Sequence, residues 1–180
     1  MGAMVPPSRK SCYNFRVVSI DRVVDGDTID VTIDLGFDLY KKERVRIAGV
    51  DTPEKRTRDL EEKALGLDAT NWMKEQSEEA INGESELTIR TELQGGMGKY
   101  GRLLGWLYVG DAEVSLNEQM IEEGYAWDYD GGTKRKDFAS LRAIREANGT
   151  LDVEPSEGDP LPEVGDGLQS TTAANLPGLY

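Results

Sequence analysis

The sequence contains no histidine, and that absence removes several kinds of chemistry at once. Without imidazole the chain has no histidine general base, no histidine metal ligand and no Ser-His-Asp triad. A single cysteine, Cys12, also excludes a disulfide within the chain. Any enzymatic chemistry must therefore use carboxylates, arginine, lysine, tyrosine or a metal ion.

The chain also lacks long apolar runs and a surplus of basic residues. No stretch approaches the length of a membrane span, and residues 1–10 lack the apolar centre of a signal peptide. We expect a soluble protein, either cytoplasmic or the mature form of a secreted one, with residues 1–3 as a cloning remnant before a start at Met4. The net charge of −13 is unfavourable for a nucleic-acid binder, which usually needs a basic surface.

The acidic surplus is spread unevenly. Residues 152–180 hold six acids and no lysine or arginine, which leaves 28 acids against 21 bases in the rest of the chain. This segment is rich in Pro, Gly, Ser and Thr, so we expect a tail that does not fold alone. The expected organisation is a flexible segment at 1–12, a folded domain at 13–150 and an acidic tail at 151–180.

Apolar periodicity predicts a small barrel with helices. Alternating or β-branched runs predict strands near residues 15–24, 29–35, 44–50, 86–91 and 102–109. Helical spacing and capping signals predict helices near residues 59–81, 115–124 and 134–147. Five short antiparallel strands with a helix between the third and fourth fit an α+β fold of OB type, a five-stranded Greek-key barrel with about three helices.

Three short motifs carry the candidate chemistry. They are Asp25-Gly26-Asp27-Thr28, Arg46-(x)4-Asp51-Thr52-Pro53-Glu54 and Lys99-Tyr100-Gly101-Arg102. Taken singly, each has a plain structural interpretation, respectively a turn between strands, the approach to a helix and a solvated loop. Their combination is much harder to explain by local structure alone.

Together the motifs indicate a site for a metal ion and a phosphate. Asp27 is in phase with the apolar residues of strand 29–35 and Asp51 ends a neighbouring strand, so the two carboxylates could converge. Oxygen ligands of this kind suit Ca²⁺ or Mg²⁺ and not Zn²⁺. Arg46 and Arg102 are candidate phosphate donors, because guanidinium matches phosphate oxygens. Glu54 is the candidate general base for water.

In this order, with a helix between the second and third, the motifs resemble those of the staphylococcal nuclease (thermonuclease) family. The resemblance covers about Phe15 to Ala147, and it implies an OB-fold barrel. It also implies a Ca²⁺-dependent endonuclease that cuts DNA and RNA by attack of water on phosphorus and leaves 3′-phosphate products. We further expect a monomer that favours single-stranded substrates.

The resemblance also implies a role for each matching residue. Asp27, Asp51 and the Thr52 carbonyl would bind Ca²⁺, and Glu54 would position or deprotonate the water. The remaining residues would act on the substrate: Arg46 and Arg102 by stabilising the transition state, Lys99 and Tyr100 by contacting a terminal phosphate.

The chain departs from the family pattern in places. The loop between Asp27 and Arg46 is longer than the usual hairpin, and the chain is acidic where the best-known members are basic. The match fades after Gly124. There we expect Trp127 to pack in the core, and Tyr129 is a candidate for stacking on a base.

Other interpretations stay open. The basic runs 55–58 and 134–136 either follow a nucleic-acid backbone or are solvated faces. The chain could be an OB module that binds nucleic acid without cutting it, although such a module would be expected to lose some of the acids and arginines present here. A restriction-type nuclease using Glu61 and Lys63 is disfavoured because both fall in a predicted helix. An interaction domain with a nucleic-acid-mimicking tail is the third alternative.

Overall fold

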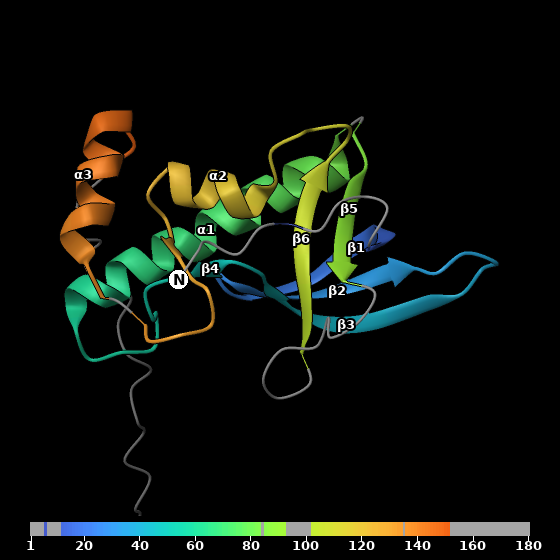
Figure 1. Cartoon of the computed structure of the whole chain (residues 1–180), viewed down its shortest axis with the longest axis horizontal. Helices are drawn as coiled ribbons and strands as arrows, with labels where there is room; N and C mark the ends of the chain where they lie inside the picture. The colour runs from blue at the N-terminus through green and yellow to red at the C-terminus, as the bar shows by residue number, and fades with distance from the viewer. Residues whose placement is uncertain (1–5, 7–11, 84, 93–101, 135, 152–180) are drawn as a thin grey trace, which may run out of the picture.

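Five strands close into a barrel in the order β1-β2-β3-β6-β5 (Figure 1). The structure is a computed structural model that describes residue 6 and residues 12–83, 85–92, 102–134 and 136–151. The strands are β1 (Cys12–Asp25), β2 (Thr28–Asp34), β3 (Tyr40–Ile47), β5 (Leu87–Glu92) and β6 (Leu103–Val109). The predicted OB-type barrel is confirmed, whereas the predicted acidic tail lies outside the described residues from 152 onward.

One pairing in the barrel differs from the prediction. All five strands were expected to be antiparallel, but β3 and β6 pair in parallel, with Arg46 opposite Leu104. A parallel pair needs a long crossover connection, and here the chain between the two strands supplies a helix and β5. The crossover closes the barrel and brings the start of β6 beside the end of β3.

The strand predicted at residues 44–50 is in fact broken. β3 ends at Ile47, Ala48 and Gly49 form a turn, and β4 (Val50–Asp51) continues in a new direction. Gly49 has a φ of 74°, a left-handed conformation that glycine adopts without steric penalty. β4 leaves the barrel and pairs with β7 (Trp127–Asp128). Apolar alternation cannot reveal this break, because residues on both sides of the turn are buried.

Three helices follow the predicted order. α1 (Leu60–Asn82) begins at Asp59, whose side chain accepts hydrogen bonds from the Glu61 and Glu62 amides. α2 (Leu116–Glu122) begins with the predicted Ser115 capping box. α3 (Phe138–Asn148) begins later than the predicted residue 134, because Asp137 caps it. None of the helices in the described part of the chain is both long and apolar enough for a membrane span.

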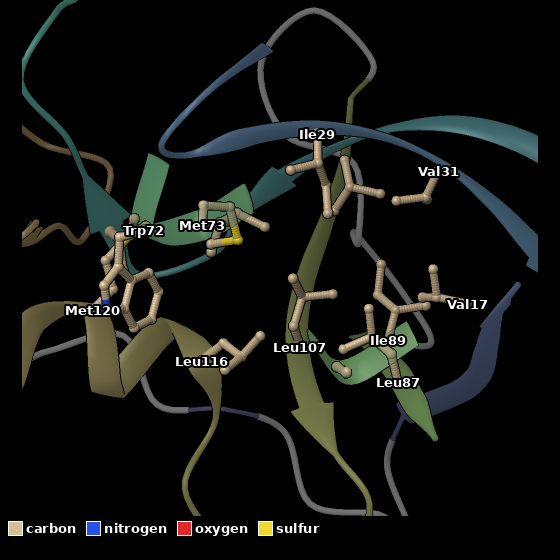
Figure 2. Packing of buried hydrophobic residues seen from close by; sticks show 14 of the residues in the cluster. Val17, Ile29, Val31, Trp72, Met73, Leu87, Ile89, Leu107, Leu116 and Met120 are labelled. Carbon is tan, nitrogen blue, oxygen red and sulfur yellow. The ribbon is translucent and has the colours of Figure 1, made fainter. Parts of the chain in front are cut away.

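The core lies between the barrel and two helices. Figure 2 shows Trp72 and Met73 of α1 and Leu116 and Met120 of α2 packing beside Ile29 and Leu107 of the barrel. β2 alternates buried and partly exposed residues, as its sequence predicts. Trp127, expected in the core, is only partly buried and packs against Phe138 at the edge.

Two glycines let α1 approach the loops that carry the sequence motifs. A Cβ atom on Gly66 would lie 2.7 Å from the Lys55 nitrogen and 2.7 Å from the Pro53 oxygen. A Cβ atom on Gly26 would lie 2.9 Å from the Ala69 side chain. These distances are shorter than packing allows, so α1 rests directly against both loops and fixes their positions.

We predict that Gly66→Ala destabilises the fold even though alanine favours helices. The added methyl group must push the segment at Pro53 away from α1, and such overpacking costs about 1–3 kcal/mol. Chemical denaturation measures the change in the free energy of unfolding. The control is Lys63→Ala on the exposed side of the same helix, for which we expect less than about 0.5 kcal/mol. Unchanged stability in Gly66→Ala would show that α1 does not constrain this segment.

Candidate active site

A single guanidinium joins two of the predicted metal ligands. Arg46 stands opposite Thr28 in the β2–β3 register, so its side chain reaches the turn that carries Asp27. Its Nη1 lies 2.8 Å from Asp27 Oδ2, and its Nη2 lies 3.4 Å from Asp51 Oδ1. The Arg46 side chain is only 11% exposed. Two carboxylates from separate segments therefore share one desolvated cation.

Several hydrogen bonds fix Asp27 in this position. Its backbone oxygen accepts from the Ile47 amide at 2.8 Å and from Arg46 Nη1 at 3.1 Å. Its Oδ1 accepts from the Thr28 hydroxyl at 2.8 Å. The Asp27 carboxylate thus has a defined orientation before any ligand binds, which is what a preorganised site requires.

Asn117 holds the turn that leads to Asp51. This buried side chain on α2 donates from Nδ2 to the Ala48 oxygen at 2.7 Å and to the Gly105 oxygen at 3.0 Å. Its Oδ1 accepts from the Leu107 amide at 3.0 Å. One amide therefore ties the β3–β4 turn to β6. These hydrogen bonds also fix the direction in which the chain leaves the barrel, and so they place Asp51 beside Arg46.

A cavity of about 500 Å³ lies beside the two aspartates. Asp27 and Arg46 line it, whereas Asp51 does not line it and contacts two residues that do, Arg46 and Lys134. Four further residues predicted from the sequence are also in its wall: Thr52, Glu54, Arg102 and Tyr129. Lys99 and Tyr100 lie outside the described residues, so their predicted substrate contacts stay predictions.

The predicted general base, Glu54, and the predicted phosphate donor Arg102 come from different parts of the fold. Glu54 is exposed, and its Oε1 accepts a hydrogen bond from the Arg56 amide at 3.1 Å, which orients the carboxylate. Arg102 is partly buried immediately before β6. Because β6 runs parallel to β3, Arg102 enters the cavity beside the end of β3. The cavity wall therefore combines a carboxylate and a second guanidinium.

Asp25 belongs to the cavity wall, although its sequence indicated only a turn. Its Oδ1 is buried and accepts no hydrogen bond from the described residues, and the nearest ammonium, Lys55 Nζ, is 3.7 Å away. Burial raises the pKa of the Asp25 carboxyl, an effect that Lys55 opposes and that Glu54 and Asp27 strengthen. The sequence signal for Asp25 is that the Asp-Gly-Asp run holds two acids, because a turn alone does not require both.

Lys134 was also missed as a site residue. For its basic run the sequence predicts either a solvated face or contacts with a nucleic-acid backbone. In the structure, Lys134 Nζ lies 2.6 Å from Asp51 Oδ1, and Lys136 pairs with the buried Glu62 at 2.8 Å. Nothing in the local sequence predicts these pairs, because each joins residues more than 70 positions apart.

The oxygen-rich wall fits a hard divalent cation. The carboxylates of Asp25 and Asp27 and the Thr52 segment line one cavity, the Asp51 carboxylate contacts Arg46 beside it, and the buried Asp25 Oδ1 has no hydrogen-bond donor among the described residues. Within the described ranges, no cluster of three or more His, Cys, Asp or Glu residues is spaced to hold a metal by itself. A cation here would therefore take one or two carboxylates and complete its shell with carbonyl, water or substrate oxygens, as Ca²⁺ and Mg²⁺ do.

Fold and site together define an OB-fold domain whose cavity combines carboxylates with guanidinium groups. A family model described as "Staphylococcal nuclease homologue" matches residues 44–149, more than half of the chain. The chain belongs to the staphylococcal nuclease family. The family assignment predicted from the three motifs is therefore confirmed.

Individual relatives agree with this assignment. The chain is 33% identical to Endonuclease YncB of Bacillus subtilis over 71% of its length and 56% of the relative. It is 35% identical to Thermonuclease of Staphylococcus intermedius over 67% of its length and 65% of the relative. The identity to the SPbeta prophage-derived endonuclease YokF of B. subtilis is 34%, over 65% of this chain and 36% of the relative. The chain thus spans about a third to two thirds of the length of these relatives.

We predict that Asp25→Asn stabilises the metal-free chain at neutral pH. The raised pKa means that the folded state holds the Asp25 proton more tightly than the unfolded state, so ionisation at neutral pH lowers stability. We expect a melting temperature higher by ~2 °C at pH 7, with a gain that shrinks as the pH falls through the raised pKa of Asp25 and is absent below the ordinary aspartate value of about 3.9. The control is Glu75→Gln on the exposed face of α1. A lower melting temperature in Asp25→Asn at pH 7 would contradict the prediction.

Proposed function

We propose that the chain is a Ca²⁺-dependent endonuclease that hydrolyses phosphodiester bonds in DNA and RNA and leaves 3′-phosphate products. The observation that carries the proposal is the bridge from Arg46 to Asp27 and Asp51, beside Glu54 and Arg102 around one cavity. Membership of the staphylococcal nuclease family and relatives named as endonucleases and thermonuclease support it.

Three oxygen donors would hold the metal. These are the carboxylates of Asp27 and Asp51 and the backbone carbonyl of Thr52, which is buried at the cavity wall. Bound there, Ca²⁺ would neutralise charge on the phosphodiester and orient it for an in-line displacement. The hydrogen bonds to Asp27 keep one of the donors in place before the ion arrives.

Glu54 would act as the general base. In the proposed reaction a water oxygen forms a bond to phosphorus, and the bond between phosphorus and the 5′ oxygen breaks. Glu54 takes the proton of the attacking water, and the 5′ oxygen leaves and takes a proton from solvent. The Arg56 amide already occupies Glu54 Oε1, so Oε2 is the oxygen that faces the water in this proposal.

Arg46 and Arg102 would stabilise the charge that develops on the phosphoryl oxygens. Guanidinium donates two parallel hydrogen bonds to such oxygens, and its effect is larger where water is excluded. Water is largely excluded from Arg46, because only 11% of its side chain is exposed. Arg102 lies immediately before β6, the strand that pairs in parallel with β3. The two guanidinium groups could therefore hold the phosphate from different sides of the cavity.

The remaining predicted contacts concern the rest of the substrate. By resemblance to the family, Lys99 and Tyr100 would contact a terminal phosphate. Tyr129 lines the cavity, and its ring could stack on an unpaired base, which would favour single-stranded substrates. The competing proposal, an OB module that binds without cutting, would keep these contacts and lose turnover.

We predict that cleavage depends on Ca²⁺. End-labelled single-stranded DNA and RNA are incubated with the protein in Ca²⁺, in Mg²⁺ and in EGTA, and the products are resolved on denaturing gels. We expect cleavage in Ca²⁺, none in EGTA, and product ends that a polymerase extends only after removal of a 3′ phosphate. Equal cleavage with and without EGTA would defeat the metal assignment, and binding without cleavage in any metal would favour the binding module.

We also predict that Glu54→Gln and Arg102→Lys each lower turnover strongly while the protein stays folded. Loss of a general base or of a transition-state donor typically costs about 10²–10⁴-fold. Turnover is measured at saturating substrate, and melting temperatures report folding. The controls are Glu75→Gln and Arg16→Lys, neither of which lines the cavity. Turnover at the wild-type rate in either site variant would show that its role is misassigned.

A further inference from the structure

The segment after β7 places a lysine at the entrance to the cavity. Tyr129 pairs with the barrel turn through its amide, which donates to the Gly49 oxygen at 2.9 Å. The chain then turns at Gly131, whose φ is 90°, and Lys134 joins the cavity wall. Its Nζ approaches Asp51 Oδ1 at 2.6 Å, the shortest cation contact that the structure gives for this carboxylate.

Lys134 and Arg46 contact Asp51 through the same oxygen. Arg46 Nη2 lies 3.4 Å from Oδ1, and Lys134 Nζ lies 2.6 Å from it. The Asp51 side chain is only 5% exposed, so without cationic partners its charge would be buried at a high cost. Lys134 therefore supplies much of the compensation that Asp51 needs when no metal ion is present.

A divalent ion on Asp51 would compete with the lysine. Ca²⁺ sits about 2.3–2.6 Å from its oxygen ligands, so an ion on this carboxylate and an ammonium at 2.6 Å would repel each other strongly. One of the two cations beside Asp51 must then withdraw. Arg46 is pinned by Asp27 and 11% exposed, whereas the Lys134 side chain is 58% exposed on a flexible stem. Lys134 is the one that can leave at little cost.

We propose that Lys134 is a displaceable counterion built into the site, and that metal binding releases it from Asp51. This inference rests on the proposed function, because it takes Asp51 as a metal ligand. In the metal-free protein the ammonium neutralises Asp51 and ties the segment of residues 129–134, which contributes to the cavity wall, to β4. Metal binding breaks that contact, so the apparent affinity for the metal is lowered by the strength of the lysine contact.

The chain offers a closely matched control pair. Lys136 Nζ lies 2.8 Å from Glu62 Oε1, and the two side chains are 58% and 5% exposed, the same values as for Lys134 and Asp51. Neither Lys136 nor Glu62 lines the cavity. Removing either lysine thus deletes an ion pair of the same kind, but only one of the two pairs involves a proposed metal ligand.

Calorimetric titration of CaCl₂ into the full-length chain, Lys134→Met and Lys136→Met tests the proposal. We expect Lys134→Met to bind Ca²⁺ more tightly by about fivefold, which corresponds to the ~1 kcal/mol at the upper end for an exposed ion pair. Lys136→Met should bind it with unchanged affinity. Lys134→Gln, which keeps a polar side chain without the charge, should behave as Lys134→Met does.

Melting temperatures give a second readout that does not depend on activity. In EGTA both methionine variants should melt below the wild type, because each leaves a buried carboxylate with one partner fewer. Saturating Ca²⁺ should remove the difference for Lys134→Met and preserve it for Lys136→Met. Equal or weaker Ca²⁺ binding by Lys134→Met would overturn the proposal that metal binding displaces Lys134, but not the proposed metal site itself. Absence of Ca²⁺ binding by all three proteins would overturn the proposed metal site, and displacement with it.

Discussion

The site depends on one interaction, the contact of the Arg46 guanidinium with two carboxylates from different segments. Asp27 comes from the β1–β2 turn and Asp51 from β4, and both side chains are largely buried. Without Arg46 the two negative charges would repel each other in a poorly solvated place. Removing one member of such a buried group typically costs about 3–5 kcal/mol, because the remaining charges are left uncompensated. The contact that positions the two carboxylates therefore also compensates their buried charge.

The strand register of the barrel places Arg46 where it can contact both carboxylates. Arg46 lies opposite Thr28 on one side and opposite Leu104 on the other, so β3 is the shared neighbour of the Asp27 turn and of the segment that starts at Arg102. α1 presses on the same loops from outside at Gly26 and Gly66. A shift of one residue in β3 would turn Arg46 to the other face of the sheet. A closed barrel resists such a shift because both edges of β3 are paired.

Local sequence predicted the elements whose structure is decided locally. The alternation in β2 and the capping box at Ser115 both depend on neighbours in the chain. What could not be predicted depends on distant contacts. The parallel β3–β6 pair, the break at Gly49 held by Asn117, and the contact of Lys134 with Asp51 each join residues far apart in sequence. The family resemblance supplied the expected roles of the candidate site residues, but it did not include Asp25 or Lys134.

The acidic composition does not conflict with a site for phosphate. Net charge acts over the whole surface, but at physiological salt a charge is screened within about 8 Å, so a substrate in the cavity responds mainly to the nearest groups. Those groups are the basic residues Arg46, Arg102 and Lys134 and four acidic residues, so the metal-free cavity wall has no basic surplus: Asp25, Asp27, Glu54 and Asp130. For the proposed nucleic-acid substrate, the negative charge elsewhere on the surface would slow the approach to the site. A divalent ion that neutralises Asp51 and frees Lys134 would add positive charge at the place where the proposed substrate phosphate would bind. In this chain, therefore, the metal would prepare the site electrostatically as well as through ligation.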